Sequence, residues 1–177
     1  MHGPPLTFPR PVSLSKPVVI HTRDADDDMR AILEAFMPRD HTFHVHCYTA
    51  STELGSWVLD TFPNAYIGIT GVLSYNLPHV QEFIRSGGLP LERMLLETDA
   101  PFMTPKNIYP WMKKTRPGPE GKKRFEVSHA GMIPFTAELV AGLVNEGKAA
   151  REEGSIDVEH VLNITTSNAS KVYGIEF

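Results

Sequence analysis

The chain has 177 residues, 41% of them hydrophobic, and a formal net charge of −4 at pH 7. This composition is typical of a single domain with a buried core, and the negative charge excludes a globally basic nucleic-acid binder. No apolar stretch approaches the roughly 20 residues of a membrane-spanning helix, and the first residues do not resemble a signal peptide. The single cysteine, Cys47, excludes an internal disulfide. These features predict an intracellular protein, cytoplasmic or nuclear, without a membrane partner.

The first 15 residues contain four prolines and show no periodicity, so we expect a flexible leader followed by one domain over residues 16–177. Strands then alternate with amphipathic helices. The pattern predicts strands over 17–21, 42–47, 65–70 and 93–97, and helices over 25–37, 51–62 and 77–86. The helix over 25–37 has one apolar face, formed by Met29, Ile32, Leu33 and Phe36. This alternation is typical of an α/β fold with a parallel sheet or barrel.

A long loop containing proline and glycine is predicted to follow residue 101 and to extend to about 129, before helices over 133–148 and 157–173. A loop of that length is more often functional than a simple connection. Between Lys106 and Arg124 it carries a local charge of +6, which leaves −10 for the rest of the chain. It also carries the aromatic residues Tyr109, Trp111 and Phe125. Two interpretations remain open, a solvated loop and a basic, aromatic surface for single-stranded DNA.

Three of the predicted strands end in residues that are able to bind a metal, namely His21, His46 and Asp99. One histidine after an apolar run is usually a structural residue. However, the carboxyl ends of parallel strands meet at one edge of a sheet, so these three side chains are candidates for one open metal site. A closed βα barrel needs about 250 residues. Four strands therefore fit either part of a barrel or a small open sheet.

Several segments carry a resemblance to a known family: Lys16-Pro-Val-Val-Ile-His-Thr-Arg-Asp-Ala25, Val45-His-Cys-Tyr-Thr-Ala-Ser51, Tyr66-Ile-Gly-Ile-Thr-Gly71 and Leu95-Leu-Glu-Thr-Asp-Ala-Pro101, with Leu89-Pro-Leu-Glu-Arg-Met94 and Asn168-Ala-Ser-Lys-Val-Tyr-Gly174. In order and spacing, these blocks resemble TatD-related deoxyribonucleases over about residues 16–177. The resemblance implies a metal-dependent hydrolase on an amidohydrolase-type TIM barrel that cuts phosphodiester bonds of DNA, often from the 3′ end.

Site residues can be carried over from this resemblance one by one. It implies that His21 and His46 hold one divalent ion and that Asp99 is the carboxylate at a second metal position, where it also orients the attacking water. Mg²⁺ is the expected metal, with Mn²⁺ or Zn²⁺ as alternatives. The expected substrate is DNA, single-stranded or at 3′ ends.

The family pattern also includes a His-x-His pair on the first strand and a bridging glutamate, neither of which occurs upstream of His21. The segment His44-Val45-His46 has the same letters but matches a later block. We therefore expect an N-terminally truncated form, a partial (β/α)8 barrel with only the C-terminal strands and helices, and impaired activity. The alternatives are a hydrolase of another ester or amide, and a non-catalytic remnant that binds nucleic acid or a partner through exposed sheet edges.

Other polar residues near the predicted strand ends have structural interpretations as well. Glu97 and His44 are interpreted as structural or supporting residues and not as ligands. For Arg23, a phosphate contact competes with a salt bridge to Asp24 or Asp26. The candidate phosphate-binding residues are Arg23, Lys113, Lys114, Arg116 and His129.

Overall fold

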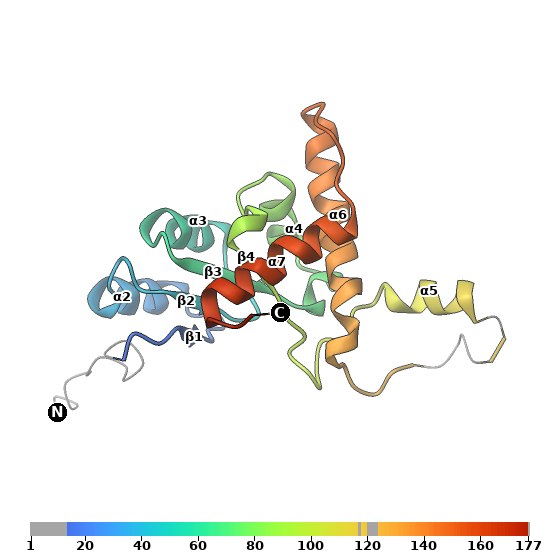
Figure 1. Cartoon of the computed structure of the whole chain (residues 1–177), viewed down its shortest axis with the longest axis horizontal. Helices are drawn as coiled ribbons and strands as arrows, with labels where there is room; N and C mark the ends of the chain where they lie inside the picture. The colour runs from blue at the N-terminus through green and yellow to red at the C-terminus, as the bar shows by residue number, and fades with distance from the viewer. Residues whose placement is uncertain (1–13, 117, 120–123, 177) are drawn as a thin grey trace.

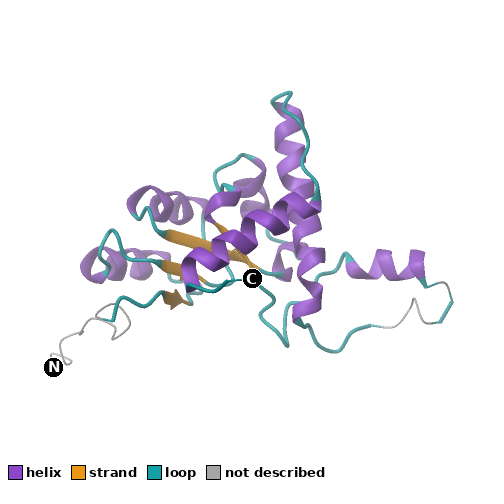
Figure 2. Ribbon diagram, in the orientation of Figure 1, coloured by secondary structure: helices purple, strands orange, loops and turns teal. Residues whose placement is uncertain are grey.

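The computed structural model describes residues 14–116, 118–119 and 124–176. The predicted leader therefore lies, except for its last two residues, outside the described part of the chain. Four short strands form one parallel sheet in the order β1-β2-β3-β4. Their bounds are β1 Val18–Ile20, β2 Phe43–Val45, β3 Ala65–Ile69 and β4 Met94–Leu96. The predicted α/β fold with a parallel sheet is confirmed (Figure 2).

A helix follows each of the first three strands. These helices are α2 (Asp26–Phe36), α3 (Thr52–Thr61) and α4 (Pro78–Arg85), each within one residue of its predicted bounds. Ser51 caps α3, because its side chain accepts a hydrogen bond from the Leu54 N–H at 3.2 Å. The short 3₁₀ turns η1 (Gly71–Ser74) and η2 (Leu91–Arg93) lie in the connections after β3 and before β4.

The core lies between the sheet and these helices. Its most deeply buried side chains include Phe43, Val45, Val58, Phe62, Ile67, Ile69, Ile84 and Met94. On the predicted apolar face of α2, Met29 and Leu33 are buried, whereas Ile32 is 54% exposed. In the described part of the chain, β1 is the last strand on this side of the sheet, so no further element covers Ile32.

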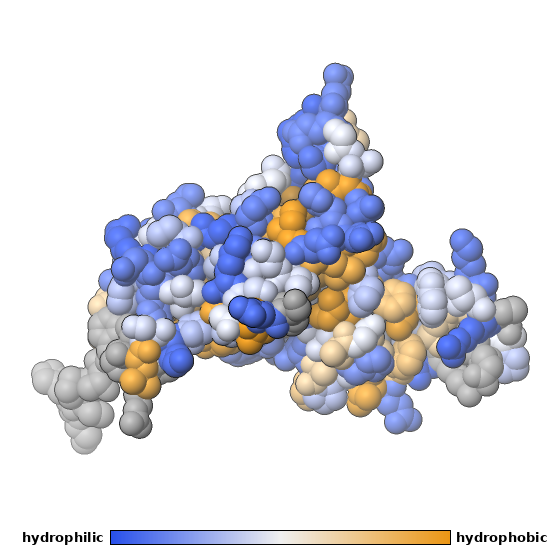
Figure 3. Space-filling model, viewed as in Figure 1, coloured by the Kyte–Doolittle hydropathy of each residue, from blue (hydrophilic) through white to orange (hydrophobic). Residues whose placement is uncertain are grey.

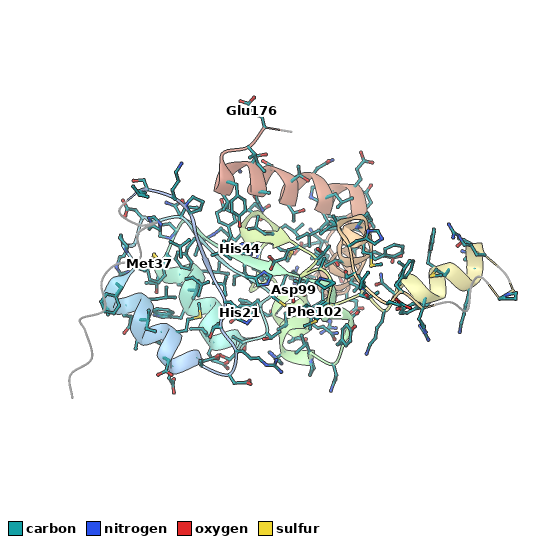
Figure 4. The ribbon with its side chains drawn as sticks, turned by 90° about the horizontal axis from the view of Figure 1, so that it is seen from below. His21, Met37, His44, Asp99, Phe102 and Glu176 are labelled. Carbon is teal, nitrogen blue, oxygen red and sulfur yellow. The ribbon has the colours of Figure 1, made fainter. Side chains whose placement is uncertain are left out.

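Two long helices, α6 (Ile133–Ala150) and α7 (Val158–Tyr173), complete the described fold. Helix α6 packs against α4 and η1, and α7 packs against β4 and η2. Figures 1 and 4 place α7 on the opposite side of the sheet from α2 and α3. In Figure 3, hydrophobic side chains gather along the middle of α6 and its tip is hydrophilic. No described helix has the length and apolar character needed to cross a membrane.

The predicted long loop is partly wrong, because it contains helix α5 (Ile108–Thr115). Ile108 and Met112, four residues apart on one face, pack on Met132 of the 3₁₀ turn η4 (Ala130–Met132). Pro110 lies in the first helical turn, where a missing N–H breaks no intrahelical hydrogen bond. Figure 1 shows α5 to one side of the sheet, reached through the segment that follows β4.

Candidate metal centre

Hydrogen bonds of the sheet continue beyond the strands and hold the site residues at its carboxyl end. The His46 N–H donates to the carbonyl oxygen of Ile20 at 2.9 Å, and the Glu97 N–H donates to that of Ile69 at 3.1 Å. The chain then turns sharply at Asp99, whose φ of 53° is left-handed. Asparagine and aspartate adopt this conformation more readily than most residues. The turn leaves the Asp99 carboxylate next to His46.

The imidazole of His46 lies between two carboxylates. Its Nδ1 is 2.7 Å from Glu97 Oε2, and its Nε2 is 3.2 Å from Asp99 Oδ1. Burial lowers the pKa of His46, but the hydrogen bonds and negative charges of Glu97 and Asp99 outweigh it and hold the pKa above its ordinary value. Because a carboxylate faces each ring nitrogen, the doubly protonated imidazolium is the favoured form in this structure.

Glu97 holds the His46 ring in place through a hydrogen bond. Its Oε1 accepts a hydrogen bond from the Cys47 N–H at 2.5 Å, while Oε2 accepts from His46. Burial raises the pKa of Glu97, but His44, the Cys47 N–H and His46 together hold it below its ordinary value. Glu97 is therefore an ionised, mostly buried carboxylate whose oxygens already have partners.

Gly68 makes room for this carboxylate. A Cβ atom at Gly68 would collide with Glu97 Oε1 and with His44 Nε2. Gly68 lies in the middle of β3, and its register partner in β4 is Leu95, two residues before Glu97. The absence of a side chain at position 68 thus lets the Glu97 carboxylate cross β3 and reach His46, just after β2.

His44 lies deeper in the sheet, with its side chain 5% exposed. Its Nδ1 is 2.8 Å from the hydroxyl of Tyr173, at the end of α7. Its Nε2 is 3.2 Å from Glu97 Oε2 but has no well-directed hydrogen bond within the described residues. This burial and the contact with Tyr173 agree with a structural or supporting position.

His21 is exposed and follows β1 directly. Its ring centroid is 5.7 Å from that of His46, and Figure 4 shows His21 and Asp99 at the same end of the sheet. The structure therefore brings all three predicted ligands, His21, His46 and Asp99, to one open edge. None of them is fully buried, which leaves space for a ligand and water.

Two positions for a cation fit this arrangement. In the described part of the chain, His44, His46 and Glu97 place ligating atoms within 4.8 Å of one another. A cation there would have to replace the contacts of Glu97. The other position lies between His46 Nε2 and Asp99 Oδ1, where a cation would take the place of the second imidazolium proton. His46 would then keep its Nδ1–H bond to Glu97, the usual partner arrangement of a metal-bound histidine. The imidazole and carboxylate donors fit a divalent metal at this second position.

The predicted phosphate contacts are scattered. The Arg23 Nε lies 3.8 Å from Asp24 Oδ2, and both side chains are almost fully exposed. The His129 Nδ1 accepts a hydrogen bond from the Gly131 N–H at 3.1 Å and caps η4. Lys113, Lys114 and Arg116 are exposed at the end of α5. Of these five residues, only Lys113 borders a basic pocket, which also contains Lys106 and Arg124.

Sequence reasoning missed Gly68 and Tyr173, although each touches the site. Both lie inside the family-like blocks, at Tyr66-Ile-Gly-Ile-Thr-Gly71 and Asn168-Ala-Ser-Lys-Val-Tyr-Gly174. Their presence in those blocks was the available signal. Their roles depend on contacts between residues 29 and 129 positions apart in the chain, from Gly68 to Glu97 and from His44 to Tyr173.

Comparison with known proteins decides the family. The family model described as TatD related DNase matches residues 10–174. The chain belongs to this family. The human protein named 3′-5′ RNA nuclease TATDN2 is 43% identical over 98 residues, which cover 55% of this chain and 13% of that protein. The protein named 3′-5′ ssDNA/RNA exonuclease TatD from Pantoea ananatis is 32% identical over 162 residues, covering 92% of this chain and 54% of that protein.

Solved structures agree on the fold. An uncharacterised amidohydrolase from Saccharomyces cerevisiae matches with a TM-score of 0.66 and 20% identity, covering 90% of this chain and 54% of that one. A TatD family hydrolase from Entamoeba histolytica also matches with a TM-score of 0.66, at 18% identity and with 50% of that chain covered. These neighbours are TIM barrels. This TatD-family chain spans about half the length of most of the relatives it matches, and its four parallel strands correspond to part of their barrel.

Proposed function

We propose that this chain supplies His21, His46 and Asp99 to a divalent metal centre that hydrolyses phosphodiester bonds in single-stranded nucleic acid from the 3′ end. The observation that carries the proposal is the position of His46, with Nδ1 bound to Glu97 and Nε2 facing Asp99. Relatives named 3′-5′ exonucleases and metal-dependent hydrolases support the reaction class.

Each residue has a distinct part in this proposal. A bound divalent cation would polarise the phosphoryl oxygen and lower the pKa of water. His21 and His46 would hold the cation, and Glu97 would keep the His46 ring in the required orientation. The Asp99 carboxylate, which is 30% exposed, is the candidate acceptor for the proton of the attacking water. Mg²⁺ is the proposed metal. Mn²⁺ is an alternative that carboxylate donors suit, and Zn²⁺ is one that imidazole donors suit.

Both DNA and RNA are proposed substrates, because relatives are named as nucleases of one or both. The proposed phosphate contacts are Arg23, Lys113, Lys114, Arg116 and His129. All five side chains belong to exposed residues of segments that follow β1 or β4.

The test uses single-stranded DNA and RNA that carry a 5′ label. The purified 177-residue chain is incubated with Mg²⁺, Mn²⁺ or Zn²⁺, and products are separated by length. We expect a ladder that shortens from the 3′ end and disappears in a chelator. Asp99→Asn, purified in the same way, is the control for a contaminating nuclease. Equal cleavage by wild type and Asp99→Asn would refute the proposal.

A second candidate is a protein that binds nucleic acid without cutting it. The observation that favours it is the small number of metal-binding side chains. Within the described residues, the proposed cation position has His21, His46 and Asp99, and Glu97 is already bound to His46. Binding of single-stranded DNA without any metal-dependent cleavage would support this candidate over the hydrolase.

A further inference from the structure

A basic pocket is formed by residues of the segments that follow β3 and β4. It has a volume of about 560 Å³ and is lined by Tyr75, Lys106, Tyr109, Pro110, Lys113 and Arg124. Its lining contains three cations, two aromatic rings and, within the described residues, no carboxylate. A pocket with this charge favours an anionic ligand over a neutral one, and its volume lies in the range of small-ligand sites.

The pocket is built by two segments that follow neighbouring strands. The Tyr75 hydroxyl, just after η1, donates to the carbonyl oxygen of Thr104 at 3.1 Å. The Lys106 N–H donates to Ser74 Oγ at 2.9 Å. Gly71 lets the two segments touch, since a Cβ there would collide with the carbonyl oxygen of Met103. The pocket therefore has a defined wall at the carboxyl end of β3 and β4.

Both aromatic rings of the pocket carry a cation on one face. The Lys106 Nζ lies 4.1 Å from the centroid of the Tyr75 ring, and the Arg124 Cζ lies 3.9 Å from that of Tyr109. These are close cation–π pairs. Tyr75 is 36% exposed and Tyr109 is partly buried, so the rings offer apolar surface beside positive charge.

We infer that this pocket is a binding site for an unpaired nucleotide of a single-stranded nucleic acid, separate from the metal centre. Single strands bind where aromatic or guanidinium planes stack with bases and cations contact the backbone. Tyr75, Tyr109 and Arg124 provide the planes, and Lys106 and Lys113 provide the backbone contacts. A duplex fits poorly, because its bases are already stacked and paired.

The position of the pocket gives it a role in the proposed reaction, and this inference rests on the proposed function. Lys106 is seven residues beyond Asp99, so at most about 25 Å of extended chain separates them. A strand bound in the pocket would have neighbouring nucleotides within reach of His46 and Asp99. The pocket would therefore hold the body of the strand while its end is at the metal centre.

Binding is measured without metal, so that its result does not depend on hydrolysis. The probe is a fluorescently labelled oligothymidylate of about 12 nucleotides. Its binding to the protein is measured by fluorescence anisotropy in a buffer that contains a chelator. Tyr109→Leu and Tyr75→Leu keep an apolar side chain but lose the aromatic face. We expect each to raise Kd by about 5- to 100-fold, the loss of one stacked base. Tyr109→Phe keeps the ring and is expected to bind as wild type does.

Two further measurements test the charge of the pocket and its preference for single strands. Lys113→Glu is expected to weaken binding, whereas Lys171→Glu, an equal charge change on α7, is expected to change Kd less than twofold. Unlabelled single strands should compete, and duplex DNA of the same length or inorganic phosphate at equal nucleotide concentration should compete far less.

Two results would overturn the inference: Leu variants that bind as tightly as wild type, or a wild type with no preference for single strands. Neither would affect the cleavage test with Asp99→Asn, which addresses the metal centre alone. Conversely, absence of cleavage with intact, tyrosine-dependent binding would refute the hydrolase proposal and leave the pocket standing.

Discussion

His46 Nδ1 lies 2.7 Å from Glu97 Oε2, and this contact determines which ring nitrogen faces Asp99. The contact joins a residue just after β2 to one just after β4, across β3. The contact orients the His46 ring, so that its Nε2 points toward Asp99. The following predictions test this arrangement and the elements that support it.

Removing the charge of Glu97 should weaken metal binding without abolishing it. Glu97→Gln keeps the size of the side chain but loses the ionised partner of His46 Nδ1. We expect the Kd for Mn²⁺, measured by calorimetry, to rise by about 10- to 100-fold. Glu34→Gln, an exposed change on α2, is the matched control. If Glu97→Gln binds no metal at all, Glu97 is itself a ligand.

His21 and His44 distinguish the two cation positions. A cation between His46 Nε2 and Asp99 would lie on the same side of His46 as His21. A cation at Glu97 would instead use His44. We therefore expect His21→Ala to raise the metal Kd at least tenfold more than His44→Ala. The opposite order would assign the metal to His44, His46 and Glu97. Far-ultraviolet circular dichroism should show that both variants remain folded.

Gly68→Ala should both weaken metal binding and destabilise the fold. The new Cβ would collide with Glu97 Oε1 and His44 Nε2, so the Glu97 carboxylate must leave its place on β3. We expect a loss of about 1–3 kcal/mol in the free energy of unfolding in urea, together with weaker metal binding. Gly142→Ala on α6, where a Cβ would meet open space, is the control and should be neutral or stabilising. Wild-type stability of Gly68→Ala would contradict this packing.

The raised pKa of His46 makes a distinct contribution to stability. A raised folded-state pKa stabilises the protein fully below the ordinary value of 6.5, and this stabilisation is lost as the pH rises through the folded-state pKa. In a chelator, the free energy of unfolding of wild type should therefore fall as the pH rises above about 6.5, by an amount that His46→Gln lacks. A parallel pH dependence in both proteins would show that His46 is not held between the carboxylates.

Asn168 anchors α7 to the sheet. Its buried Nδ2 donates to the carbonyl oxygens of Leu91 at 2.7 Å and Met94 at 2.8 Å. Asn168→Ala removes both hydrogen bonds, although the Leu91 carbonyl oxygen keeps the Met94 N–H as a donor. We therefore expect a loss of about 1–3 kcal/mol in urea unfolding. Asn163→Ala, at an exposed position of the same helix, should cost less than about 0.5 kcal/mol. Similar stabilities of the two variants would show that the two hydrogen bonds contribute little.

The sequence alone determined the four strands, the helices other than α5, and the strand-end positions of His21, His46 and Asp99. It could do so because helical and strand periodicity are local, and the carboxyl ends of parallel strands must meet. Periodicity also grouped Ile32 with Met29 and Leu33 on one apolar face of α2, but Ile32 is exposed, because burial depends on which elements lie beside the helix.

Only the tertiary structure decided the partners of these residues. The Glu97 contact with His46, the space above Gly68 and the Tyr173 contact with His44 each join segments far apart in the chain. Helix α5 and the basic pocket likewise depend on packing between distant loops. Such contacts leave no periodic signal in the sequence, because they are set by how the strands and helices meet in space.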